Sequence, residues 1–177
     1  LIRWEGEEAT ERARGEVCAG AEAAGRDPDA IKLGVVTAVY PVEDESELET
    51  PEARAALGPL VVSRLRYLTA VHGRPEEVPE PFRPGFAEYQ AYRAGLDLET
   101  RHLENYLGYL VFTPEHLERF VTPASMQTIA HIADRAGVAA ELRRIRDAGV
   151  DQATLQIVGP PRRWCERMGA EVLPALR

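Results

Sequence analysis

The sequence contains little of what marks several large protein classes. Cysteine occurs twice in 177 residues, as Cys18 and Cys165, and neither lies in a CxxC pair. That count excludes a disulfide scaffold and favours free thiols in a reducing cytoplasm. No apolar run reaches the roughly 18 residues of a membrane span. Lysine is almost missing, since Lys32 is the one lysine among 21 basic residues, a bias typical of GC-rich genomes.

Several site motifs are missing too. The sequence contains no GxGxxG, GxxxxGK[ST] or GxSxG pattern, which leaves nucleotide-binding folds and hydrolase elbows without support. Its four histidines form neither HxH nor HExxH, so we expect no metal site. They are His72, His102, His116 and His131.

The charge balance is acidic, at a net −8, which argues against nucleic acid or an anionic membrane as the main partner. Hydrophobic residues make up 45% and charged residues 28%, as in an ordinary globular domain. The acids crowd between residues 43 and 52. We interpret this run as a solvated loop or the acidic first turn of a helix, in preference to a metal site.

Apolar spacing predicts a helix over residues 6–24 and another from about residue 57 to 70. Between them, residues 31–40 are apolar at nearly every position, which is typical of a parallel strand buried on both faces. Near the end of the chain the pattern predicts a helix around residues 138–148 and a second buried strand at 153–158. A last helix is expected from about residue 162 to 176.

The middle of the chain is irregular. Four prolines between residues 72 and 84 forbid long regular structure, and we expect residues 72–125 to form a partly helical insert, of the kind that serves as a lid or docking loop. Helices are predicted at 86–93 and 97–110. The pairs Thr113-Pro114 and Thr122-Pro123 are typical of helix starts, with threonine as N-cap and proline at the first helical position.

Alternation of buried strands and helices predicts parallel strands joined by helical crossovers. Two full strands and a fragment at Leu1–Trp4 make too small a sheet to be self-sufficient, and a (β/α)8 TIM barrel needs about 250 residues. We therefore expect residues 1–177 to be the C-terminal portion of such a barrel, about strands 6–8, with the N-terminal half missing from this chain.

Three segments resemble one family, the luciferase-like monooxygenase superfamily, over nearly the whole chain. They are Gly25-Arg26-Asp27-Pro28-Asp29-Ala30-Ile31, Asn105-Tyr106-Leu107-Gly108-Tyr109-Leu110-Val111-Phe112 and Ile145-Arg146-Asp147-Ala148-Gly149-Val150-Asp151-Gln152. The chain departs from the family at Ala133-Asp134-Arg135-Ala136-Gly137, where relatives start a helix with Gly-Thr/Ser-Pro-Glu. It also has Tyr106 and Tyr109 where one branch has histidine.

The resemblance implies an oxidoreductase that uses FMN or the deazaflavin F420, with F420 favoured, to transfer hydride to a small organic substrate or to oxygenate it. In a barrel the working residues follow the carboxyl ends of the strands. That rule singles out Trp4, Gln156 and Gly159 as cofactor contacts. For Trp4, packing beneath the next helix is the favoured alternative, and Gly159 is equally well explained as a turn glycine.

His102 and Tyr106 are spaced to share one helical face and are candidates for a substrate pocket, although an exposed helix face is the favoured alternative. Two other functions stay open. One is a non-catalytic truncated homologue that docks on a partner chain to complete a barrel, and the other is a small independent α/β protein. Expected partners are a small-molecule substrate, a flavin-type cofactor and either further copies of the chain or the missing half.

Overall fold

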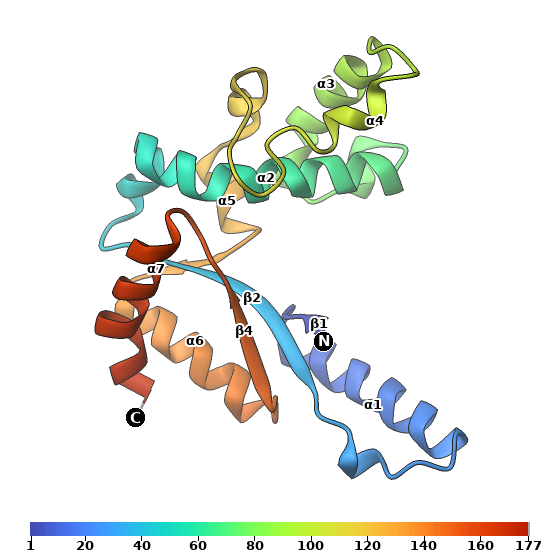
Figure 1. Cartoon of the computed structure of the whole chain (residues 1–177), viewed down its shortest axis with the longest axis vertical. Coiled ribbons are helices and arrows are strands. Elements are labelled where there is room, and N and C mark those ends of the chain that lie inside the picture. The colour runs from blue at the N-terminus through green and yellow to red at the C-terminus, as the bar shows by residue number, and fades with distance from the viewer. Residues whose placement is uncertain (177) are drawn as a thin grey trace. The chain divides into compact units, whose positions relative to one another are not determined.

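The computed structural model describes residues 1–176 and shows a mixed α/β protein made of two compact units (Figure 1). The first unit comprises Leu1–Glu43 together with the chain from His131 onward, and it contains the sheet. The second unit, Asp44–Ala130, is helical. The insert expected at 72–125 lies inside this second unit, which also includes the long helix that precedes it.

Among the described residues the sheet has four strands, and every pairing in it is parallel. The central strand is β2 (Gly34–Pro41). Both β1 (Ile2–Arg3) and β4 (Gln152–Gln156) pair with the Val35–Val36 part of β2, so they occupy its two opposite edges. A short strand that the apolar pattern did not predict, β3 (His131–Ala133), pairs further along β2. The described sheet does not close into a barrel.

The two faces of β2 differ in burial. Val35 and Val39 point to one face and are 0% exposed, whereas Val36 and Tyr40 on the other face are only half-buried. Helix α6 (Arg135–Asp147) covers the first face and contributes most of its core partners. The core cluster on this face consists of Val35, Val39, Val138, Ala139, Leu142, Ile145, Met168 and Val172.

The expected burial on both faces is therefore met only in part by β2, where Ala38 is the buried residue of the other face, and it is wrong for β4. Gln152, Ala153 and Thr154 of β4 are exposed, and only Leu155 packs against the core cluster. A strand with a single neighbour and one helix-covered face has too few contacts to be buried throughout. We refer below to the side of the sheet away from α6 as the second face.

Helix α1 (Glu7–Ala23) confirms the first predicted helix. The predicted final helix is wrong in its continuity, because α7 (Pro161–Arg167) passes into a π-helical turn at Met168–Val172 and a 3₁₀ turn at Leu173–Leu176. Pro174 explains the change of winding, since proline supplies no N–H to an α-helical hydrogen bond and its ring crowds the preceding turn.

The helical unit is built on α2 (Pro51–Val71), whose N-cap Thr50 accepts a hydrogen bond from the backbone N–H of Ala53 at 3.2 Å. The acidic run before it forms a 3₁₀ helix at Glu45–Glu49. Asp44 caps that turn by accepting from Ser46 N at 2.8 Å. The run therefore consists of solvated and capping carboxylates, in agreement with the charge pattern.

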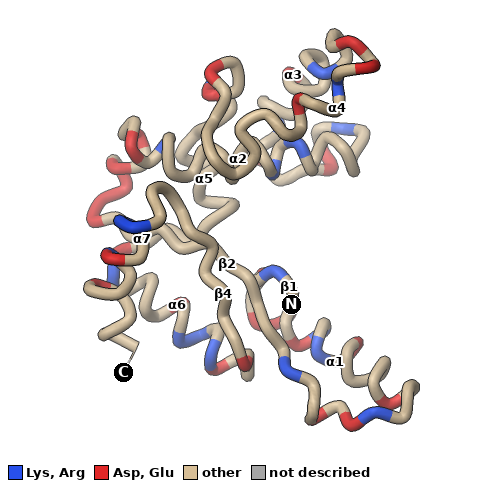
Figure 2. The backbone as a smooth tube through the Cα atoms, in the orientation of Figure 1, with Lys and Arg blue, Asp and Glu red and all other residues tan. Residues whose placement is uncertain are grey.

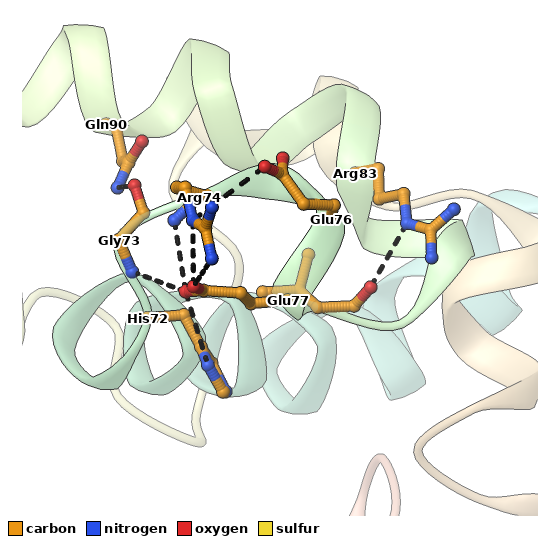
Figure 3. A network of polar contacts seen from close by, with 8 residues as sticks. His72, Gly73, Arg74, Glu76, Glu77, Arg83 and Gln90 are labelled. Carbon is orange, nitrogen blue, oxygen red and sulfur yellow. Dashed lines mark hydrogen bonds and ion pairs between the residues drawn. The ribbon is translucent and has the colours of Figure 1, made fainter.

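The proline-rich connection after α2 is organised by one carboxylate, that of Glu77 (Figure 3). It accepts from the backbone N–H of Gly73 at 3.0 Å and from Arg74 Nη2 at 2.8 Å. These bonds, above all that from the Arg74 side chain, lower the pKa of Glu77. A segment that cannot form a ladder of backbone hydrogen bonds is thus given a fixed shape by a side chain.

Helix α3 (Arg83–Ala94) follows, but the helix predicted at 97–110 is reduced to α4 (Arg101–Glu104). Beyond it the chain turns repeatedly, and Gly108 and Leu110 adopt φ angles of +67° and +56° that no α-helix contains. Thr122 caps α5 (Pro123–Gln127), as its Thr-Pro pair predicts.

The other Thr-Pro pair, Thr113-Pro114, does not start an α-helix. Thr113 caps no helix, and the turn after it, Glu115–Phe120, is 3₁₀. The Thr113 hydroxyl lies 2.3 Å from where a Cβ on Gly58 would be, so the helix surface at Gly58 is in contact with this threonine. The chain at Thr113 is thus packed against α2.

Ile145 is the core position at which we expect the largest loss on truncation in the sheet unit. The side chain is 1% exposed and lies within the core cluster, so Ile145→Ala should lower the free energy of unfolding by about 2 to 5 kcal/mol. Leu173→Ala, at a position 46% exposed, is the matched control and should change it by less than about 0.5 kcal/mol. Urea unfolding followed by circular dichroism measures both, and equal losses would contradict this account of the core.

Candidate functional site

Gln156 ends β4 at the carboxyl edge of the sheet, beside Ala38 of β2. Side chains alternate along a strand, and Leu155 points to the core cluster, so Gln156 points to the second face. Its neighbours there are Val36, Ala38 and Tyr40 of β2. The arrangement places the Gln156 amide beside the side chains of β2, at the carboxyl end of a row that also contains Gln152 and Thr154 of β4.

Trp4 lies on the opposite face of the sheet from Gln156. It follows β1, packs against the core cluster, and donates a hydrogen bond from Nε1 to Glu141 Oε1 at 2.7 Å. Glu141 belongs to α6, is 8% exposed and accepts a second hydrogen bond from Arg144 Nη1 at 2.8 Å. The indole is thus packed beneath α6, which is not the next helix along the chain, and the structure does not bring it together with Gln156.

Gly159 lies in the loop between β4 and α7, three residues after Gln156. Its φ of +80° is in the region that favours glycine, so the turn requires this residue. Val158 beside it is 3% exposed and anchors the loop. Gln156 and Gly159 therefore share the carboxyl edge of β4, where a ligand of a parallel sheet would lie.

His102 and Tyr106 do not form the face that was expected of them. The helix that should carry both ends at Glu104, and Tyr106 N bonds to Leu103 O at 3.0 Å in a tighter turn. Both side chains are exposed, Tyr106 to 72%. The buried polar side chain of this region is instead that of Glu104, which lies between them in the sequence.

Four residues of the helical unit form a buried polar cluster that the sequence did not reveal: Arg66, Tyr92, Glu104 and His116. Glu104 Oε1 lies 3.3 Å from Arg66 Nη2 and 3.2 Å from His116 Nε2. The Tyr92 hydroxyl lies 3.0 Å from the same imidazole nitrogen. The side chains of Arg66 and Glu104 are 6% and 9% exposed, while that of His116 is 37% exposed and connects the cluster to solvent.

Arg66 joins α2 to the chain that follows α4. Besides Glu104, its guanidinium donates to the carbonyls of Asn105 at 3.2 Å and Leu107 at 3.1 Å. Burying an arginine is costly unless it is paired and hydrogen-bonded, and these three acceptors bind the two terminal nitrogens of Arg66, while its Nε is buried without a partner among the described residues. The cluster therefore fixes the irregular segment that begins at Asn105.

Two phenols in and beside the cluster have shifted acidities. Burial is the main cause that raises the pKa of Tyr89, which is 0% exposed, and the nearby Arg66 opposes that rise. Burial also raises the pKa of Tyr92, and the Glu104 carboxylate adds to the rise. Among the described residues the Tyr89 hydroxyl has no hydrogen-bond partner.

A weak signal of the cluster is present in the sequence. Arg64 and Arg66 both interrupt the apolar part of α2, but their spacing does not say which of them is buried. Glu104 and His116 lie twelve residues apart in two separate short helical turns, so no periodicity links them. Only the path of the chain after α4 brings them together.

Comparison with known proteins finds no match for this chain, either among protein-family models or among curated proteins. Within residues 1–176 no three His, Cys, Asp or Glu side chains are grouped as metal ligands, and no helix there is long and apolar enough to cross a membrane.

The ion pair in the cluster predicts an asymmetric response to substitution. Arg66→Met leaves the Glu104 carboxylate buried without its main partner and should cost about 3 to 5 kcal/mol of unfolding free energy. Adding Glu104→Gln to Arg66→Met removes that unpaired charge and should restore part of the loss. A double-mutant cycle by urea unfolding tests this, and strictly additive losses would show that the two groups do not interact.

The raised tyrosine pKa values predict a loss of stability in alkali. Above pH 10 the phenols ionise in the unfolded chain while Tyr89 and Tyr92 stay protonated in the folded one, so the unfolded state binds fewer protons. The contribution of these two phenols to stability should therefore be constant below about pH 10 and fall as the pH rises toward the folded pKa values. Tyr89→Phe should make the decline between pH 9.5 and 11 shallower, and an unchanged slope would exclude Tyr89 as its source.

Proposed function

We propose that the chain is the carboxyl-terminal portion of a luciferase-like (β/α)8 barrel and serves as a flavin- or deazaflavin-dependent oxidoreductase. One observation carries the proposal: the parallel strands β1 and β4 lie on the two edges of β2, with a polar residue, Gln156, at the carboxyl edge of β4 on the second face. In a βα-barrel, consecutive strands are neighbours, helices cover the outer face, and ligands bind at the carboxyl edge.

The two faces of the sheet support this assignment. Val36, Ala38 and Tyr40 are the kind of side chains that fill a barrel interior, yet Val36 and Tyr40 are only half-buried. Exposed residues of β4 lie along an edge of the sheet that further strands would cover in a complete barrel. On this proposal those strands belong to a part of the barrel that lies outside these 177 residues.

In this assignment the protein supplies binding and orientation, and FMN or F420 supplies the hydride chemistry. The Gln156 amide would donate and accept hydrogen bonds at the edge of a flavin-type ring. Gly159 allows the backbone to approach a ligand closely. Trp4, on the core face, would support the sheet rather than stack on the ring. The substrate implied by the family resemblance is a small organic molecule.

An alternative follows from the same exposed edge. A non-catalytic homologue that docks on a partner chain would present β4 for pairing, because an uncovered strand edge offers unpaired backbone groups. This protein would bind no flavin by itself and would bind its partner through residues 152–156. The spectrum of the purified chain, together with its mass in solution, separates the two proposals.

Titration with FMN and with F420 tests the oxidoreductase assignment. Gln156→Ala should weaken binding by about tenfold, because a ligand group left without its hydrogen bond loses ~1–3 kcal/mol. Gln152→Ala is the matched control, since it lies on the same strand and the same face but at the amino end, and should change the affinity less than about twofold. Quenching of cofactor fluorescence measures the affinity of the wild-type chain and of both variants.

Two results would contradict the proposal. One is a chain that binds neither cofactor at millimolar concentration, and the other is equal weakening by the two glutamine substitutions. Circular dichroism of each variant confirms that the sheet is intact before the affinities are compared.

A further inference from the structure

A segment of the helical unit displays apolar side chains to an unusual extent. From Asn105 to Pro114 the chain has no charged residue, although 28% of the whole sequence is charged (Figure 2). Seven large apolar residues between 103 and 112 are exposed, from 43% for Leu110 to 79% for Val111. We call these seven the apolar loop: Leu103, Tyr106, Leu107, Tyr109, Leu110, Val111 and Phe112.

The apolar loop is held in shape at some cost. Arg66 is buried to bind the carbonyls of Asn105 and Leu107. Leu110 has a φ of +56°, which is unfavourable for a residue with a branched side chain. A Cβ at Gly108 would lie 2.4 Å from the Phe112 carbonyl oxygen, so this turn can only be made with glycine.

Fixed structure and exposed apolar surface together indicate a binding surface. A loop without a partner would lower its free energy by relaxing the strain and covering its apolar groups. A loop that is already ordered loses less conformational entropy when it binds, which favours association.

The size of the surface indicates another protein. With about 150 to 200 Å² for each large side chain, the exposed fractions of the apolar loop correspond to roughly 600 to 800 Å². The largest apolar patch on a typical monomer is about 300 to 600 Å², whereas each side of a standard protein interface buries about 800 Å². The summed exposed area of the seven side chains is therefore close to the area that one side of an interface buries.

We propose that the apolar loop is the contact between two copies of this chain, related by a two-fold axis. Each chain carries a net charge of −8, so two copies repel one another over most of their surfaces. The loop is a surface without charge of either sign, on which two acidic chains can meet without pairing like charges. An apolar patch is also complementary to itself, as a two-fold interface requires.

Sedimentation of the full chain over a concentration series tests the proposal. The wild-type chain should be a dimer at micromolar concentration. Val111→Glu and Tyr106→Glu each place two carboxylates, one from each copy, in the contact and should raise the dimer dissociation constant at least tenfold. Val17→Glu, an exposed apolar position on α1, is the matched control and should leave the constant within twofold.

Hydrogen exchange gives a second measurement that needs no variant. Backbone amides between residues 103 and 112 should exchange more slowly at high than at low concentration of the wild-type chain, while those of α1 should not change. A chain that stays monomeric, or a dimer that withstands both loop substitutions with no protection of 103–112, would overturn the proposal. So would protection of the loop by phosphatidylcholine vesicles alone, since the surface would then bind lipid rather than a second copy.

Discussion

Strand β2 is the element on which the sheet unit depends, because each of the other described strands hydrogen-bonds to it. Its eight residues carry both the pairing register and the centre of the core, where Val35 and Val39 are 0% exposed. A slip of one residue would turn those two valines to the second face and bring Val36 and Tyr40 beneath α6. Asp151 helps to prevent such a slip, since its carboxylate accepts from Leu33 N at 2.8 Å and binds Lys32 at 3.2 Å.

The helical unit is held by a different kind of interaction. Its helices pack through apolar residues, but the segment after α4 has no helix of its own and depends on Arg66 and Glu104. Ion pairs of this kind contribute specificity more than net stability, because desolvation offsets much of their attraction. The unit thus combines an ordinary core with a polar anchor for one surface loop.

Sequence reasoning identified the elements whose signals are local. The helix at 6–24, the apolar strand that became β2 and the Thr122-Pro123 helix start all follow from spacing or capping within a few residues. It missed β3, because three residues are too few for any period to appear. It overestimated the helix at 97–110, where the apolar spacing was helical but Gly108 and the chain path favoured turns.

The candidate site residues show the same division. Alternation along a strand suffices to place Gln156, once β4 exists, on the face opposite Leu155. The position of Trp4 depends on which face of β1 lies beneath α6. The pairing of β1 with β2, in which Ile2 lies beside Val35, decides this. The cluster of Arg66, Glu104 and His116 depends wholly on tertiary structure, and no pattern in the chain could have joined its members.

The connection between β2 and β3 is much longer than the pairing of these two strands requires. Parallel neighbours can be connected by about a dozen residues, usually one helix, yet here the whole unit Asp44–Ala130 makes that connection. Pro41 and Ala133 are register partners, so the chain leaves and re-enters the sheet at neighbouring positions. The helical unit is therefore an insertion between two paired strands, and its length is not dictated by the geometry of the sheet.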